Sequence, residues 1–105
     1  MLSDGFERFS IQIPPRWIDE LKAMRDEAVL LGRAEEFLKN LKELKYRLSV
    51  EPDEWGESRE YLPVLQLEMR FGVVGIISVW YGVDVVRQTV IVKSFGLRGG
   101  LDGSP

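Results

Sequence analysis

Residues 61–95, YLPVLQLEMRFGVVGIISVWYGVDVVRQTVIVKSF, decide the fold of this chain. The stretch is rich in branched aliphatic and aromatic side chains, which favour strands. Phe71-Gly72 and a break near Asp84 divide it into three expected strands. Because the connections between the three runs are short, they predict an antiparallel meander.

The polar residues in this stretch predict which faces of the strands are buried. In the first run, apolar residues alternate with polar ones, which predicts one buried and one wet face. Residues 73–83 are apolar on both faces, as expected for a central strand. In the last run, one side is expected to carry Thr89, Ile91, Lys93 and Phe95, and the other Val90, Val92 and Ser94.

The sequence before this stretch predicts a short strand and two helices. Residues 6–13, FERFSIQI, alternate as a half-buried strand does, and Pro14-Pro15 ends it and starts a helix at Pro15 or Arg16. Gly32 is expected to end that helix. Apolar residues three or four apart form the buried stripes of an antiparallel helical hairpin: Trp17, Leu21, Met24, Ala28 and Leu31, then Phe37, Leu41, Leu44 and Leu48.

The second expected helix carries a cluster of cations, namely Lys39, Lys42, Lys45 and Arg47. Two interpretations stay open: a solvated helix face with acidic partners, or a strip that binds a partner or phosphates. Residues 51–60, EPDEWGESRE, predict an acidic loop, whose carboxylates do not have the spacing of a calcium-binding loop. Trp55 is interpreted as an anchor that holds this loop to the helices rather than as a ligand-stacking ring.

Together these elements predict an α+β fold, β-α-α-β-β-β, in which an antiparallel sheet packs against a helical hairpin. Residues 1–95 are expected to form a single domain, and residues 96–105 a flexible, glycine-rich tail. The first strand could pair at an edge of the meander or beside its central strands.

Composition excludes many activities. The 105 residues include no cysteine and no histidine, so thiolate chemistry, disulfides and imidazole-based catalysis are excluded, and no metal or cofactor is expected. The net charge of -3 argues against a surface built wholly for nucleic acid. No apolar run is long enough to cross a bilayer, and the acidic N-terminus is not a secretory signal, so a cytoplasmic location and no membrane partner are expected.

A family resemblance rests on four segments: KELKYRLSVEPDEWGES (residues 42–58), LQLEMRFGVV (65–74), VWYGVD (79–84) and TVIVKSFGLR (89–98). With the order of elements, they make residues 6–98 resemble the RelE/ParE toxin superfamily of toxin-antitoxin systems. The closest points are the loop with proline and glycine after the second helix, the Arg-x-Gly at Arg70 and Gly72, and a strand ending in Tyr81.

The resemblance implies candidate catalytic residues, because ribonuclease members of the superfamily use a basic sheet face to cleave messenger RNA on the ribosome. By position these are Arg70, Tyr81, Lys93 and Arg98. Ser78 stands where a second arginine is expected, and no histidine is present. Without imidazole, Tyr81 would be the acid or base, a role poorly suited to its reference pKa near 10.

We therefore expect a toxin-antitoxin-type protein that acts through protein-protein contacts and has little or no ribonuclease activity. Its partner would be an antitoxin-like protein or a second copy of the chain, docking at an exposed sheet edge or on the helical hairpin. The alternatives are an active ribosome-dependent messenger RNA endoribonuclease and a gyrase inhibitor. Nucleic acid binding is less favoured, because Trp80, Tyr81 and Phe95 are interpreted as packing residues rather than a base-stacking platform.

Overall fold

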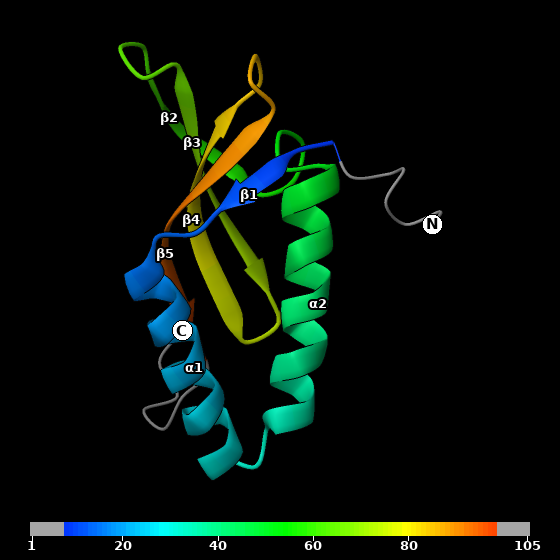
Figure 1. Ribbon diagram of the computed structural model, residues 1–105. Coiled ribbons are helices and arrows are strands. Elements are labelled where there is room, and N and C mark those ends of the chain that lie inside the picture. The colour runs from blue at the N-terminus through cyan, green and yellow to red at the C-terminus, as the bar shows by residue number, and fades with distance from the viewer. Residues whose placement is uncertain (1–7, 99–105) are drawn as a thin grey trace.

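The computed structural model describes residues 8–98, which form two helices and one five-stranded sheet (Figure 1). In chain order the elements are β1 (Ser10–Gln12), α1 (Pro15–Leu30), α2 (Ala34–Val50), β2 (Glu57–Leu62), β3 (Leu67–Val74), β4 (Ile77–Asp84) and β5 (Thr89–Leu97). The strand order across the sheet is β1-β5-β4-β3-β2.

The sheet topology confirms the α+β class and the helical hairpin packed on one face. Strands β2 to β5 form an antiparallel meander, as expected. Strand β1 lies at the edge and pairs in parallel with β5, with Ile11 opposite Val90. The sheet is therefore mixed rather than wholly antiparallel, and it contains one strand more than the sequence predicted.

The expected break at Phe71-Gly72 is wrong, because β3 continues through both residues. The chain instead turns at Gly75, whose φ of 55° is in the left-handed region that glycine adopts without strain. Asn40 of α2 supports this turn, since its Oδ1 accepts a hydrogen bond from the Ile76 N–H at 3.0 Å. Residues 73–83 are consequently parts of two strands and not one.

The expected loop over residues 51–60 is too long, because β2 begins at Glu57. This strand pairs with β3 at the sheet edge, with Ser58 opposite Arg70 and Tyr61 opposite Glu68. Its first five residues are all exposed, so it has no buried face. An apolar alternation of the kind that reveals a strand in a sequence is therefore absent from β2.

Both ends of α1 lie where the sequence placed them. The helix begins at Pro15, and Gly32 has the left-handed φ of 73° expected just beyond a helix end. The Gly32 N–H donates to the Val29 carbonyl at 3.0 Å, and the Arg33 N–H donates to the Ala28 carbonyl at 2.7 Å. These two bonds are those of a Schellman motif, which satisfies the free carbonyls at the end of α1.

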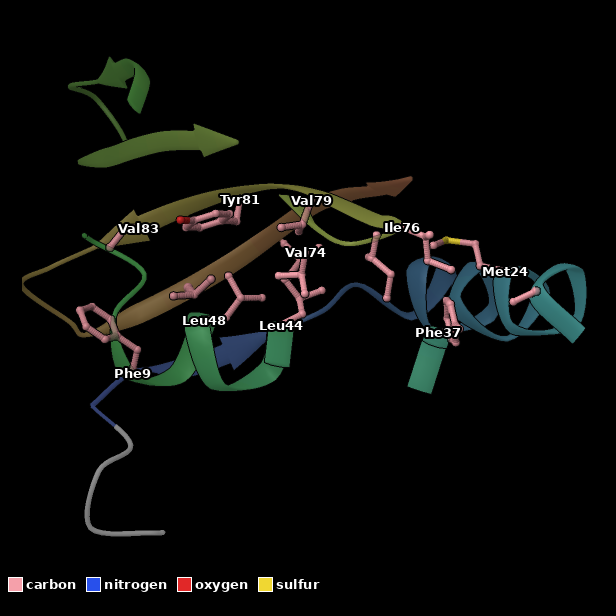
Figure 2. Packing of buried hydrophobic residues seen from close by; sticks show 14 residues of the cluster. Phe9, Met24, Phe37, Leu44, Leu48, Val74, Ile76, Val79, Tyr81 and Val83 are labelled. Carbon is pink, nitrogen blue, oxygen red and sulfur yellow. The ribbon is translucent and has the colours of Figure 1, made fainter. Parts of the chain in front are cut away.

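The core lies between the helices and one sheet face, here called the helix face. The β4 residues Ile77, Val79, Tyr81 and Val83 are buried there with side chains from both helices (Figure 2). The remaining buried hydrophobic residues are Phe9, Met24, Ala28, Phe37, Leu44, Leu48, Val74, Ile76, Val90 and Val92. The opposite side of the sheet, which only the start of α1 borders, is the open face.

A β-bulge in β5 changes which of its residues reach the core. Tyr81 pairs with Val92, but Trp80 pairs with Ser94, so Lys93 is an extra residue in β5. Beyond the bulge, Phe95 lies opposite Val79 and packs against the core. The predicted placement of Phe95 on the same side as Lys93 is therefore wrong.

The end of the domain also differs from the expectation. Gly96 and Leu97 belong to β5, and Leu97 packs against the core, so the ordered fold extends beyond residue 95. The rest of the expected tail, residues 99–105, and the start of the predicted first strand, residues 6 and 7, lie outside the described residues. Within residues 8–98, neither helix has the length and hydropathy needed to cross a membrane.

Candidate functional site

Two of the four candidate catalytic residues, Arg70 and Tyr81, lie side by side. They are directly opposite each other on β3 and β4, and residues in opposite positions project from the same sheet face. Both are on the helix face, where Tyr81 is fully buried and Arg70 is only 8% exposed. The resemblance therefore singled out two residues that the fold does bring together.

The loop between α2 and β2, residues 51–56, covers this pair. The Arg70 Nε donates to the Trp55 carbonyl at 2.8 Å, and its Nη2 donates to the Gly56 carbonyl at 3.1 Å. The Tyr81 hydroxyl is 2.6 Å from the Trp55 carbonyl and 2.9 Å from the Pro52 carbonyl. Both side chains therefore bind loop backbone.

Ring packing closes the same loop over the sheet. The Trp55 ring stacks on Tyr81, with centroids 5.9 Å apart and planes 13° from parallel. A Cβ at Gly72 would lie 2.3 Å from the Trp55 ring, so only glycine leaves room for it. Trp55 is an anchor of the loop, as predicted, but the prediction that it holds the loop to the helices is wrong, because its ring packs on Gly72 of β3 and Tyr81 of β4.

The electrostatic surroundings of Tyr81 favour its neutral form. Burial raises the pKa of the Tyr81 hydroxyl to about 12, and the nearby Arg70 guanidinium opposes that shift. Arg70 is also paired with Glu68, with 2.8 Å between Nη1 and the carboxylate oxygen. A general acid or base works best when its pKa is near the working pH, and Tyr81 is far from that condition.

The raised pKa gives a prediction for alkaline stability. An unfolded tyrosine has a pKa near 10.0 and the folded pKa is about 12, so the folded state holds this proton more tightly. The contribution of the neutral Tyr81 hydroxyl to the free energy of unfolding is thus fully present below pH 10. It is lost as the pH rises from 10 to 12, which lowers the free energy of unfolding by about 2 to 3 kcal/mol. Urea unfolding at several pH values should show this decline in the wild type, and Tyr81→Phe should flatten it. Equal slopes in the two proteins would contradict the assignment.

The other two candidates lie apart from this pair. Lys93 is exposed and is the extra residue of the bulge in β5. It lies two residues after Ile91, which pairs with Gly82 on the open face. Arg98 follows β5, and its N–H donates to the Ile76 carbonyl at 2.6 Å, near the turn between β3 and β4. Ser78 pairs with Val73 and Gly96 in the neighbouring strands. A joint catalytic role for Arg70, Tyr81, Lys93 and Arg98 stays a prediction.

A feature that no sequence motif marked is an apolar groove beside α2, here called the helix groove. It has a volume of about 710 Å³ and lies among α2, β1, α1 and Phe95. Leu38 is 51% exposed although it is apolar, and it lines the groove. The apolar lining comprises Ile11, Ile13, Leu21, Leu38, Leu41, Leu44, Leu48 and Phe95.

Lysines from α2 line the same groove. Lys39, Lys42 and Lys45 contribute three positive charges, and Glu35 contributes one negative charge. These lysines form no ion pair with any residue in the described range 8–98. Arg47, by contrast, pairs with Glu43 and Glu51. The predicted cationic strip thus consists of a neutralised arginine and three lysines beside an apolar surface.

The described residues do not assemble a metal site. No group of three or more aspartates and glutamates within residues 8–98 has the arrangement needed to hold a metal ion. The acidic residues of the α2–β2 loop are instead partly engaged by arginines, with Arg47 bound to Glu51 and Arg8 3.8 Å from Asp53.

Comparison with known proteins agrees with the fold reached from the sequence. No protein-family model and no curated protein matches the chain. The two helices followed by an antiparallel meander define an α+β protein with a RelE/ParE-like fold. A similar solved structure is a chain of the "Chromosomal ParDE TA system from P. aeruginosa", with a TM-score of 0.60 and 16% identity. The match covers 87% of this chain and 97% of that one.

Proposed function

We propose that this chain is a toxin-antitoxin-type protein that acts through protein-protein contacts and has little or no ribonuclease activity. The observation that carries the proposal is the contrast between two places on the helix side of the molecule. Arg70 and Tyr81 are buried and bound to loop carbonyls, whereas the helix groove is open, apolar and lined by three lysines. The fold shared with a ParDE toxin-antitoxin chain supports the same conclusion.

The partner that suits the helix groove is an antitoxin-like segment with an amphipathic, acidic helix. Apolar residues on one face of such a helix would cover Leu38 and Leu41, as helices do in hydrophobic grooves. Glutamates or aspartates beside that face would meet Lys39, Lys42 and Lys45. The apolar contact would supply most of the affinity, and the charges would set orientation and association rate.

The proposed low ribonuclease activity follows from the poor access of RNA to the side chains of Arg70 and Tyr81. Cleavage by a ribose 2′-hydroxyl needs a group that takes a proton and cations that reach the phosphate. The Tyr81 hydroxyl is covered by loop residues, and Arg70 already binds the Trp55 and Gly56 carbonyls and Glu68. Among the candidates, Lys93 is exposed, but it lies on the open face of the sheet, whereas Tyr81 is buried on the helix face.

A binding experiment tests the groove. The purified chain and the product of the neighbouring reading frame should form a complex, and Leu38→Asp should weaken it by about 30-fold, as for an interface hot spot. Lys42→Glu should weaken it less and reduce its dependence on salt. Lys22→Glu is the matched control, because Lys22 is an exposed α1 lysine outside the groove.

Two results would overturn the proposal. If folded Leu38→Asp bound that partner as tightly as the wild type, or if no complex formed, the helix groove would not be the docking site. If the wild type cleaved messenger RNA on ribosomes and Lys93→Ala abolished cleavage without loss of stability, the protein would be a ribonuclease.

A further inference from the structure

The open face of the sheet carries a second groove, here called the sheet groove, with a volume of about 690 Å³. One wall is the start of α1, with Pro14, Arg16 and Trp17, and the other is built around the turn between β2 and β3. Its apolar residues are Leu62, Leu65, Leu67, Met69, Ile91 and Val92. This volume is within the range of about 300 to 1,000 Å³ that is usual for ligand sites.

A glycine in β4 shapes the floor of the sheet groove. Gly82 lies between Met69 of β3 and Ile91 of β5. A Cβ at this position would be 3.1 Å from the Met69 sulfur and 3.3 Å from Leu67 Cδ1. The absence of a side chain at Gly82 therefore lets these two side chains lie across the strand, and the floor is apolar and hollow rather than flat.

Two hairpin turns extend the apolar surface at one end of the sheet. The β2–β3 and β4–β5 turns lie at the same end of the molecule (Figure 1). Leu65, which lines the sheet groove, is 58% exposed, and Val64 and Val86 at the two turns are 94% and 84% exposed. Exposed apolar residues gathered at one end of a sheet are a feature of interaction sites.

The charge of the sheet groove is positive. Its lining contains Arg16, Arg87 and Lys93, and one acid, Asp84. Asp84 is buried and already paired, because its carboxylate accepts hydrogen bonds from both the backbone N–H and the guanidinium of Arg87. Arg16 and Lys93 form no ion pair within residues 8–98. Two cations thus remain available beside an apolar floor.

We propose that the sheet groove binds an acidic segment of a second protein, whose aliphatic side chains cover Leu65, Leu67 and Ile91 and whose carboxylates meet Arg16 and Lys93. This inference goes beyond the proposed function, because the sheet groove and the helix groove are on opposite faces of the sheet. The two sites can therefore be occupied at the same time by different partners.

The lining favours a protein segment over single-stranded RNA. Binding of a single strand relies on aromatic rings that stack on successive bases and on a row of cations along the backbone. Apart from the buried Val92, the lining of the sheet groove has one aromatic ring, Trp17, four aliphatic residues and a methionine. Arg59, which lies 5.7 Å from the Phe71 ring and 5.8 Å from the Trp80 ring, is paired with Glu57 and lies outside the groove.

A peptide selection tests this proposal. A library of random 12-residue peptides displayed on phage is selected on the immobilised full chain, with counter-selection on Lys93→Glu. The expected peptides combine acidic and aliphatic residues. In fluorescence polarisation, Lys93→Glu and Leu65→Ser should each weaken binding of the selected peptide by about tenfold, the loss expected of an ordinary interface contact.

Three comparisons decide the outcome. Val29→Ser is the matched control, because Val29 is an exposed apolar residue of α1 that does not line the groove, and it should leave binding unchanged. Lys42→Glu in the helix groove should also have no effect. Failure to enrich any peptide sensitive to Lys93→Glu would overturn the proposal. So would tighter, equally sensitive binding of a labelled 12-nucleotide RNA, which would assign the groove to nucleic acid.

Discussion

Arg70→Ala is expected to lower the free energy of unfolding by about 3 kcal/mol, the scale of removing one partner from a buried ion pair. Arg70 is 8% exposed and binds the Trp55 and Gly56 carbonyls and the Glu68 carboxylate. Its removal leaves the Gly56 carbonyl and a partly buried carboxylate without their donor, and it releases one attachment of the α2–β2 loop. Urea unfolding monitored by circular dichroism measures the change.

The control for this experiment is Arg59→Ala, which removes an arginine from the neighbouring strand. Arg59 has a side chain that is 46% exposed and an ion pair with Glu57, so its loss should cost less than about 1 kcal/mol. If Arg70→Ala were as stable as Arg59→Ala, the structural role of Arg70 would be wrong. The result also matters for assays in which expression of the chain arrests growth. If Arg70→Ala relieved the arrest, unfolding of the variant would explain the relief as well as a loss of catalysis would.

Gly72→Ala is expected to destabilise the protein by about 2 to 3 kcal/mol, in the upper part of the range for overpacking. The added methyl group would lie 2.3, 2.5 and 2.8 Å from three atoms of the Trp55 ring. Because the ring must move, its stacking on Tyr81 should be lost as well. Urea unfolding measures the stability, and near-ultraviolet circular dichroism reports the environment of the ring.

A double-mutant cycle isolates this contact. In a Trp55→Leu background, Gly72→Ala should have a much smaller effect, because the ring that it clashes with is gone. Gly96→Ala is the matched control: within residues 8–98 its Cβ would approach only the Ser78 hydroxyl, at 2.6 Å, and that small side chain can rotate away. Additive effects of Trp55→Leu and Gly72→Ala would show that the two residues do not interact.

The helices and much of the core could be predicted from the sequence because their signals are local. The stripe that includes Leu44 and Leu48 is a repeat of three and four residues, and both leucines are buried. Proline at a helix start and glycine beyond a helix end act through their own backbone preferences, so Pro15 and Gly32 marked the limits of α1. None of these inferences required knowledge of a distant contact.

The strand boundaries were less predictable because a glycine can serve two purposes. Gly72 and Gly75 look alike in the sequence, but Gly75 makes the turn with a left-handed φ, whereas Gly72 lies inside β3 under Trp55. The partner of Gly72 is distant in sequence, and only the folded chain shows it. Strand β2 escaped prediction for a related reason, since its exposed residues carry no burial pattern.

The candidate site was predicted in part. The resemblance selected Arg70 and Tyr81, and the register of β3 and β4 places them opposite each other. It could not indicate that loop carbonyls bind these two side chains, because those hydrogen bonds join residues 14 to 29 positions apart in the chain. The cationic strip on α2 was visible, but the apolar groove beside it depends on β1 and Phe95, which the fold brings next to α2.

By itself, the sequence determined the α+β class, the helical hairpin and the apolar meander, because these follow from backbone preferences and from periodic burial within each segment. The tertiary structure alone decided the parallel pairing of β1 with β5, the bulge at Lys93 and the loop closed over Arg70 and Tyr81. These features depend on contacts between segments far apart in the chain, where packing and hydrogen bonding select one arrangement among several that local preferences allow.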